Sequence, residues 1–310
     1  LNVANGFTYF LQDFKLQGCK VGNGDSDFAG QGVVRHTVFV QIPGNLIEVA
    51  ADPAVLGCQL PDSGKLHIPD SILSLAENQN GIILVTGAAG SGKSTTLTCM
   101  IDKINSERPG HIVTIEDPIE FLHKHKKSII SQREIGIDTE SYSDALRAAL
   151  RQSPNVILLG EMRDNETMSI AMTAAETGQL VLSTLHTVGA ANTVDRIIDG
   201  FPTNQQQQIR MQLSMVLKAV ISQQLLPDTN GTLYPVFEVM VVNNAIRTMI
   251  RENKTHQIET VMQTTQGMQT MDSAVFKLFS EGIISEETAV EYASSPAMMS
   301  KKIELSRGKQ

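Results

Sequence analysis

The chain has 310 residues, of which 41% are hydrophobic, enough for one large core or two smaller ones. Its formal net charge of −8 favours solubility and argues against a main surface that binds nucleic acid. The three cysteines, Cys19, Cys58 and Cys99, form no C-x-x-C pair, so their spacing indicates neither a zinc ribbon nor a disulfide framework. No apolar run reaches the roughly 18 residues of a membrane-spanning helix, and no signal peptide is visible. A reducing cytoplasm is the expected compartment.

The first part of the chain differs from the rest in composition and in its hydrophobic pattern. Residues 1–78 are rich in glycine and aspartate, with an alternating strand predicted over 33–41 and a second strand over 46–50. A loose linker is expected around 51–65, and residues 68–77 predict a short helix. This pattern favours a small N-terminal α+β domain.

From residue 79 to residue 310 the sequence predicts a second, α/β domain, because strand and helix patterns alternate. The predicted strands are 81–86, 111–116, 156–159 and 180–184, and the predicted helices are 95–105, 143–152, 165–177 and 190–198. Such alternation is typical of a doubly wound sheet. After Pro202 we expect mostly helix, apart from a strand near 233–241, and a helical C-terminal part from about residue 242.

A phosphate-binding loop lies between the first strand and the first helix of this domain. Residues 87–95 (GAAGSGKST) match the pattern G-x-x-x-x-G-K-[ST]. Glycines let the backbone wrap closely around a polyphosphate, so that N–H groups and the positive end of the helix face it. The residues that we expect to bind nucleotide here are Gly87, Gly90, Ser91, Gly92, Lys93, Ser94 and Thr95.

Two of these residues have specific chemistry. Lys93 is expected to reach the β- and γ-phosphates, and the Ser94 hydroxyl is expected to hold Mg²⁺. The alternative is a glycine-rich turn that contains a lysine by chance. The strand before the loop and the helix after it favour nucleotide binding.

Three polar segments follow predicted strands, at the sheet edge where doubly wound folds bind their ligands. They are residues 116–120 (EDPIE), the apolar strand that ends in Glu161, and the segment 182–187 that contains His186. An apolar strand that ends in an acid has the form of a Walker B element. The first segment also fits a solvated loop, and His186 also fits a structural role.

Taken together, several motifs resemble those of the type II/type IV secretion ATPases, and in particular their pilus-retraction, twitching-motility branch. The motifs are residues 87–95, 114–121 (TIEDPIEF, an Asp box), 126–128, 132–134, 160–164 (GEMRD), 174–178, 184–187 (TLHT, a His box), 245–252 (AIRTMIRE) and 267–272. The resemblance covers about residues 79–295. It implies a RecA-like P-loop NTPase core, a ring of six copies, and ATP with Mg²⁺ as cofactors.

The resemblance also implies residue roles. Glu120 would be the catalytic base, Glu161 would support Mg²⁺ and help to polarise the attacking water, and His186 would couple the γ-phosphate to domain movement. It further implies arginines at the nucleotide, because a guanidinium binds phosphate oxygens through two donors. We expect Arg35, Arg133 and Arg163 in this role. Arg147 and Arg151 are further candidates for phosphate or interface contacts. The alternative is an exposed strand arginine for Arg35 and a surface ion pair for each of the other four.

The sequence departs from the family pattern in two places. Only about 80 residues precede the phosphate-loop strand, so we expect a shortened version of the family's PAS-like first domain, with Arg35 as its only arginine. Thr248 and Met249 stand where the retraction motif usually has Asn and Leu.

The expected function is that of an ATP-hydrolysing motor for pilus retraction, at the inner face of the cytoplasmic membrane. Expected partners are further copies of the chain, the inner-membrane platform protein of the pilus and a paralogous retraction ATPase, but no nucleic acid. One alternative is a pilus-assembly or type II secretion ATPase, against which the missing C-x-x-C module argues. A nucleic-acid-translocating RecA-like motor and a regulatory ATP-binding partner are the others.

Overall fold

In a computed structural model of the chain, the structure describes residues 36–42, 45–51 and 60–307, the first two ranges by their backbone alone. Two compact units are present: Leu1–Leu60 with Pro118–Leu122, and Pro61–Asp117 with His123–Gln310. The described strands of the first unit, β1 (His36–Ile42) and β2 (Asn45–Ala51), pair antiparallel and agree with the two predicted strands.

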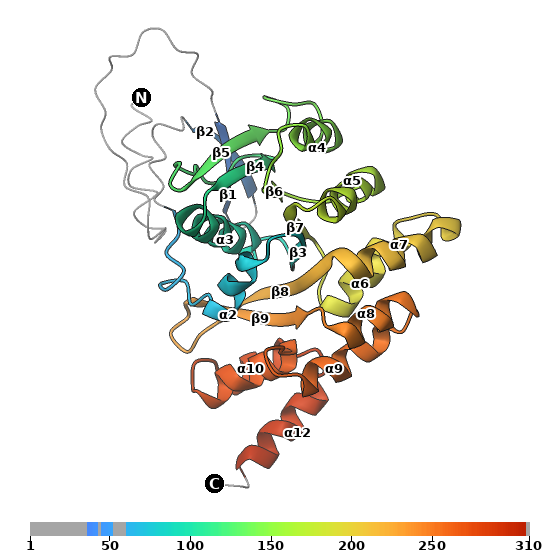
Figure 1. Cartoon of the computed structure of the whole chain (residues 1–310). Helices are drawn as coiled ribbons and strands as arrows, with labels where there is room; N and C mark the ends of the chain where they lie inside the picture. Colours follow the sequence, from blue (N-terminus) through green and yellow to red (C-terminus); the bar gives the residue numbers. More distant parts are fainter. Residues whose placement is uncertain (1–35, 43–44, 52–59, 308–310) are drawn as a thin grey trace, which may run out of the picture. The chain divides into compact units, whose positions relative to one another are not determined.

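The second unit is built on a seven-stranded sheet (Figure 1). Its strands are β3 (Gly81–Thr86), β4 (Gly110–Glu116), β5 (Ser128–Glu134), β6 (Val156–Leu159), β7 (Leu180–Leu185), β8 (Leu217–Pro227) and β9 (Leu233–Val241). Their order across the sheet is β5-β4-β6-β7-β3-β8-β9. All neighbours pair parallel except β9, which runs antiparallel to β8.

Helices cover both faces of this sheet, which confirms the predicted doubly wound arrangement. One face packs against α2 (Asp70–Leu73), the 3₁₀ turn η1 (Ser74–Glu77) and α3 (Lys93–Glu107). The other packs against α4 (Tyr142–Leu150), α5 (Asn165–Glu176), α6 (Ala190–Asp199) and α7 (Thr203–Val216). Successive residues of a strand point to opposite faces, so Ile82 and Leu84 join the second layer while Ile83 and Val85 join the first.

Beyond β9 the described chain is helical, as the sequence predicts (Figure 1). The elements are α8 (Asn244–Arg251), the 3₁₀ turn η2 (Thr255–Gln257), α9 (Ile258–Thr264), α10 (Met271–Ser280), α11 (Glu286–Glu291) and α12 (Pro296–Arg307). Helices α8 and α9 extend the core under α7, whereas α10, α11 and α12 form a separate apolar cluster with Leu226 of β8 and Val236 of β9.

Side-chain caps fix where several helices begin. The residue before each of these helices accepts a hydrogen bond from the backbone N–H three positions later, which satisfies a donor that has no partner inside the helix. The capping residues are Ser141, Asp164, Asn243, Thr270 and Ser285.

Two strands differ from the sequence-based expectation. β8 (Leu217–Pro227) is a strand where we expected helix, because its apolar residues continue the helical spacing of α7. Pairing with β3 and β9 on both sides overrides that local pattern. The edge strand β5 (Ser128–Glu134) was not predicted, since it is short and only partly buried.

The pairing of β3 with β8 contains one irregularity. Ile82 pairs with Leu217, but Ile83 pairs with Ala219, so Lys218 is an extra residue on β8. Gly81 makes room for this bulge: it has φ +103°, and a Cβ there would lie 2.6 Å from the Val216 carbonyl oxygen.

The segment between the linker and the sheet belongs to the larger unit. Ile68 and Ile72 lie in the same apolar cluster as β3 and α3, whereas the sequence placed residues up to 78 in the first domain. The domain boundary itself stays a prediction. Within the part of the chain that the structure describes, no helix combines the length and apolarity needed to cross a bilayer.

Burial makes Cys99 of α3 a testable marker of the native core. Burial, with Asp102 and Asp62 nearby, raises the pKa of its thiol to about 12. Near neutral pH the reactive thiolate form of Cys99 is therefore scarce. We expect iodoacetamide to leave the Cys99 peptide unmodified in native protein and to alkylate it in guanidinium, as measured by peptide mass spectrometry. Equal labelling rates in both conditions would contradict the packing of α3.

Candidate active site

The phosphate loop takes the conformation that the sequence predicts, between the end of β3 at Thr86 and the start of α3 at Lys93. Three of its glycines have positive φ: Gly87 at +142°, Gly90 at +75° and Gly92 at +87°. Gly92 is the residue that precedes α3. Because side chains are strained in this region, the loop needs glycine at these positions.

Strand β8 lies directly against this loop. A Cβ on Gly87 would collide with the carbonyl oxygen of Gln223, and a Cβ on Gly92 would lie 2.8 Å from the Gln223 Nε2 atom. The Gln223 side chain is 3% exposed, and its Oε1 accepts a hydrogen bond of 2.8 Å from Thr96 Oγ1 in α3. Sequence reasoning missed Gln223, since it expected a helix there.

Lys93 is held inside the loop. Its Nζ donates hydrogen bonds to the carbonyl oxygens of Gly87, at 3.0 Å, and Ala88, at 2.7 Å. The residue is 7% exposed, so its ammonium is confined close to the loop backbone. Ser94 and Thr95, both half-buried, follow in the first turn of α3. Ser91 is buried beside Gly87.

Glu161 and His186 meet at the same edge of the sheet. Because β6, β7 and β3 are parallel neighbours, their carboxyl ends lie side by side and bring these residues to the edge that carries the phosphate loop. His186 Nε2 lies 3.5 Å from Glu161 Oε1. The Glu161 side chain is 18% exposed, so the pair is partly shielded from water.

An arginine and a second acid complete this cluster. Arg163 Nε donates a hydrogen bond of 2.6 Å to Glu161 Oε2, and Arg163 Nη1 lies 3.5 Å from Asp117 Oδ2. The hydrogen bond to Glu161 raises the pKa of Arg163. Arg163 therefore compensates two carboxylates at the ends of β4 and β6.

Backbone and tyrosine contacts fix the turn that carries Glu161. Thr184 Oγ1 of β7 donates a 2.5 Å hydrogen bond to the Gly160 carbonyl, and the Met162 N–H donates to the Thr184 carbonyl at 3.3 Å. A Cβ on Gly160 would lie 3.0 Å from the Tyr142 hydroxyl. Burial and nearby Asp117 raise the pKa of Tyr142 well above its usual range. The sequence offered no signal for Tyr142, which is the first residue of α4.

The roles of the other predicted site residues at the nucleotide stay predictions. Glu120 lies in Pro118–Leu122, which groups with the first unit, so its place at the phosphates stays a prediction. Arg35 lies outside the described residues. Arg133 lies on the edge strand β5 in register with Ile115. Arg147 pairs with Glu166 of α5 at 2.7 Å on the surface.

The donor set suits a magnesium nucleotide. Within residues 60–307, no three His, Cys, Asp or Glu side chains gather to hold a metal ion by themselves. Mg²⁺ in phosphate-transfer sites takes few protein ligands and relies on phosphate oxygens and water. The Ser94 hydroxyl at the loop and the Glu161 carboxylate after β6, which β7 separates from β3, are oxygen donors of the kind that such a cation binds.

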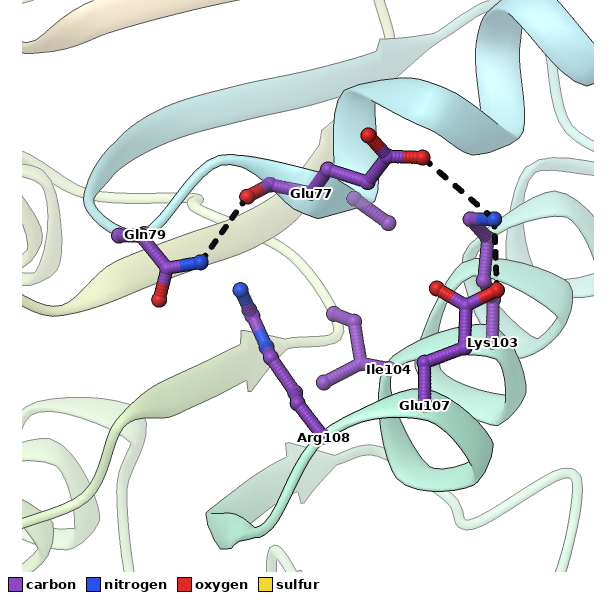
Figure 2. A pocket seen from close by; sticks show the side chains of 7 residues that line it. Glu77, Gln79, Lys103, Ile104, Glu107 and Arg108 are labelled. Atoms are coloured by element: carbon purple, nitrogen blue, oxygen red, sulfur yellow. Dashed lines mark hydrogen bonds and ion pairs between the residues drawn. The ribbon is translucent and has the colours of Figure 1, made fainter.

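A polar pocket at the far end of α3 has different chemistry (Figure 2). There Lys103 Nζ lies between Glu107 Oε1, at 2.8 Å, and Glu77 Oε1, at 3.6 Å. Arg108 donates to the Asn78 carbonyl at 3.2 Å. The two acids compensate the charge of this lysine, which disfavours an anion beside it.

Comparison with known proteins agrees with this geometry. Residues 65–232 match the family model "Type II/IV secretion system protein". The chain belongs to this family. A twitching motility protein of Neisseria gonorrhoeae is 49% identical over 264 residues, which cover 83% of this chain and 70% of that protein. The type IV pilus retraction ATPase PilT of Pseudomonas aeruginosa is 50% identical over 218 residues, 70% of this chain and 63% of that protein.

A solved structure of this family resembles the fold closely. The crystal structure of the pilus retraction motor PilT with bound ADP matches with a TM-score of 0.77 and 45% identity, over 86% of this chain and 80% of that chain. The predicted RecA-like core is therefore confirmed, and the chain is a nucleotide-binding secretion ATPase. The roles of its individual residues remain predictions.

Two glycine variants separate backbone strain from the contact with β8. Gly92→Ala adds a Cβ at positive φ and 2.8 Å from Gln223, whereas Gly90→Ala adds one at positive φ with nothing within 4 Å. We expect Gly92→Ala to weaken ADP binding by about tenfold more than Gly90→Ala, a difference of about 1.4 kcal/mol. Titration with a fluorescent ADP analogue measures both. Equal losses would show that the approach to Gln223 has no effect on binding.

Proposed function

We propose that this chain hydrolyses ATP as a ring of six copies and that hydrolysis powers retraction of a type IV pilus. The observation that carries the proposal is the shared sheet edge that holds the phosphate loop, Glu161 and His186. The similarity to a twitching motility protein and to a retraction ATPase supports the assignment to retraction.

The loop provides most of the phosphate binding. Backbone N–H groups of the loop and the first turn of α3 face the phosphates, and the helix end adds partial positive charge. Lys93 then exchanges its contacts with Gly87 and Ala88 for the β- and γ-phosphates. Ser94 and Glu161 would hold Mg²⁺, which would supply neutralisation of phosphate charge.

Hydrolysis needs a positioned water on the far side of the γ-phosphate. Glu120 accepts the proton of that water as general base, and Glu161 helps to orient it. Arg163 keeps Glu161 in place through the 2.6 Å hydrogen bond. The phosphate charge that develops in the transition state is stabilised by Lys93 and by arginines that fork onto its oxygens.

His186 links the phosphate to the protein around it. It lies beside Glu161 at 3.5 Å and on the loop that follows β7, so loss of the γ-phosphate changes the partners of both side chains. We infer that this change drives movement of the first domain against the second. Arg35, Arg133 and Arg163 are the proposed phosphate-binding arginines at domain and subunit boundaries.

The proposed setting is the cytoplasmic face of the inner membrane, with the pilus platform protein as the partner that receives the motion. A paralogous ATPase is a second proposed partner. A type IV pilus ATPase of Pseudomonas aeruginosa, PilU, is 39% identical to this chain over 278 residues.

Substitutions at the site test the catalytic assignment. We expect Lys93→Ala and Glu161→Gln to abolish ATP turnover, because the first removes the phosphate-binding ammonium and the second the carboxylate at the cation. Glu120→Gln should bind ATP normally and turn over at least about a hundredfold more slowly, as loss of a general base does. Phosphate release by the purified chain measures all three, with the exposed Glu304→Gln as control. Retained turnover in Lys93→Ala or Glu161→Gln would refute the site.

Complementation tests the biological role. Expression of the chain in a bacterium that lacks its retraction ATPase should restore twitching motility, measured as the width of the spreading zone, and Lys93→Ala should not. Restoration of pilus assembly in an assembly-deficient strain would instead identify an assembly ATPase. Motility that returns only with a paralogue present would identify a regulatory subunit.

A further inference from the structure

Strands β8 and β9 carry three buried polar side chains that the ATPase chemistry above does not use. Ser222 is 0%, Gln223 3% and Glu238 9% exposed. Ser222 and Glu238 pair across the two strands, and Gln223 follows Ser222 on the opposite face. Buried polar groups of this kind destabilise a core unless they are hydrogen-bonded, so their partners indicate what they hold in place.

Gln223 contacts the phosphate loop and the start of α3. Its Oε1 accepts the hydrogen bond of 2.8 Å from Thr96, three residues after Lys93. Its Nε2 borders Gly92, and its backbone carbonyl borders Gly87. One residue of β8 thus touches both ends of the loop and the first turn of α3.

Ser222 and Glu238 hold the loop that follows His186. Ser222 Oγ accepts a hydrogen bond of 3.1 Å from the Gly189 N–H, and Glu238 Oε1 accepts one of 2.6 Å from the Ala190 N–H. Thr193 of α6 holds this loop against the helix. Its Oγ1 lies 2.7 Å from the Thr187 hydroxyl and donates a hydrogen bond of 2.8 Å to the Gly189 carbonyl.

Glu238 has a second partner in the C-terminal helices. Its Oε2 accepts a hydrogen bond of 3.2 Å from the N–H of Met271, the first residue of α10. One carboxylate therefore bridges the first residues of two helices, α6 and α10. Figure 1 shows α10 below β9.

We propose that Ser222, Gln223 and Glu238 are positioning residues that fix the phosphate loop and the His186 loop to one strand pair, so that the two loops keep the spacing that hydrolysis requires. The inference rests on the proposed function, because both loops are taken to serve ATP. Gln223 acts through Thr96 on nucleotide binding. Ser222 and Glu238 act through residues 189 and 190 on the placement of His186.

The contact at the phosphate loop and the contacts at the His186 loop have different expected effects. Thr96→Val removes the hydroxyl donor with little change of shape, and Gln223→Met removes the acceptor. Each should raise the Kd for a fluorescent ADP analogue about threefold to tenfold, the size of one buried hydrogen bond. Thr96→Ser keeps the hydroxyl and should restore wild-type Kd. The double variant Thr96→Val/Gln223→Met should bind ADP no more weakly than the weaker-binding of the two single variants, because both changes remove the same hydrogen bond.

Glu238→Gln replaces one carboxylate oxygen with an NH₂ group, which cannot accept a hydrogen bond. Either the Ala190 N–H or the Met271 N–H then loses its acceptor. We expect kcat for ATP to fall about tenfold while the ADP Kd stays within about twofold of wild type, since the phosphate loop is untouched. Ser222→Ala should lower kcat in the same way and serves in place of Glu238→Gln if that variant does not purify folded. Glu304→Gln on α12, an exposed acid, is the matched control.

The pattern of effects decides the proposal. A changed Kd in the Thr96 and Gln223 variants, with a changed kcat alone in the Ser222 and Glu238 variants, supports it. Unchanged Kd in Thr96→Val, or unchanged kcat in folded Ser222→Ala, overturns it. So does a fall of thermal stability alone, with both constants unchanged. ADP binding is measured without hydrolysis or motility. The Kd results therefore test the inference even if the chain does not power retraction.

Discussion

The close approach of the phosphate loop to β8 is the contact on which the rest of the site depends. A Cβ on Gly87 would meet the backbone of Gln223 and a Cβ on Gly92 would meet the end of its side chain, so a larger residue at either position requires a shift. The close approach therefore restricts the loop backbone, and we expect its N–H groups to be oriented before a nucleotide arrives. Preorganised donors of this kind stabilise charge without a reorganisation step. The strand that imposes this order lies in the sheet as an ordinary neighbour of β3.

Charge compensation is the second constraint. Glu161 and Asp117 lie at the ends of adjacent strands, where two acids would repel each other without a cation between them. Arg163 supplies that cation from the turn that carries Glu161. The arrangement holds an acid close to the phosphate edge while the net charge there stays moderate. It also explains why the arginine that sequence reasoning assigned to the nucleotide is in contact with carboxylates in the structure.

Much of this core follows from local sequence patterns. The strand, glycine loop and helix from β3 to α3 are specified by an apolar run and the motif that follows it, and the positions of Glu161 and His186 follow from strand ends. β8 could not be predicted in this way. Leu213, Val216 and Val220 keep helical spacing across the point where α7 becomes β8, so only pairing with two neighbouring strands reveals the change. Gln223 and Tyr142 act by contacts over long sequence distances, which spacing does not encode.

The extra residue on β8 has a consequence for how this protein can vary. Lys218 shifts the alternation of the strand, so that Ala219 and Ile221 share the α3 side with Gln223 while Ser222 points to the α6 side. Because Ile82 pairs with Leu217 and Ile83 pairs with Ala219, deletion of Lys218 would close the bulge and leave Gln223 and Ser222 on their present faces. The junction of α7 and β8 can therefore lose this residue without turning the side chains that border the two loops, whereas a one-residue slip of β8 against β3 would exchange their faces.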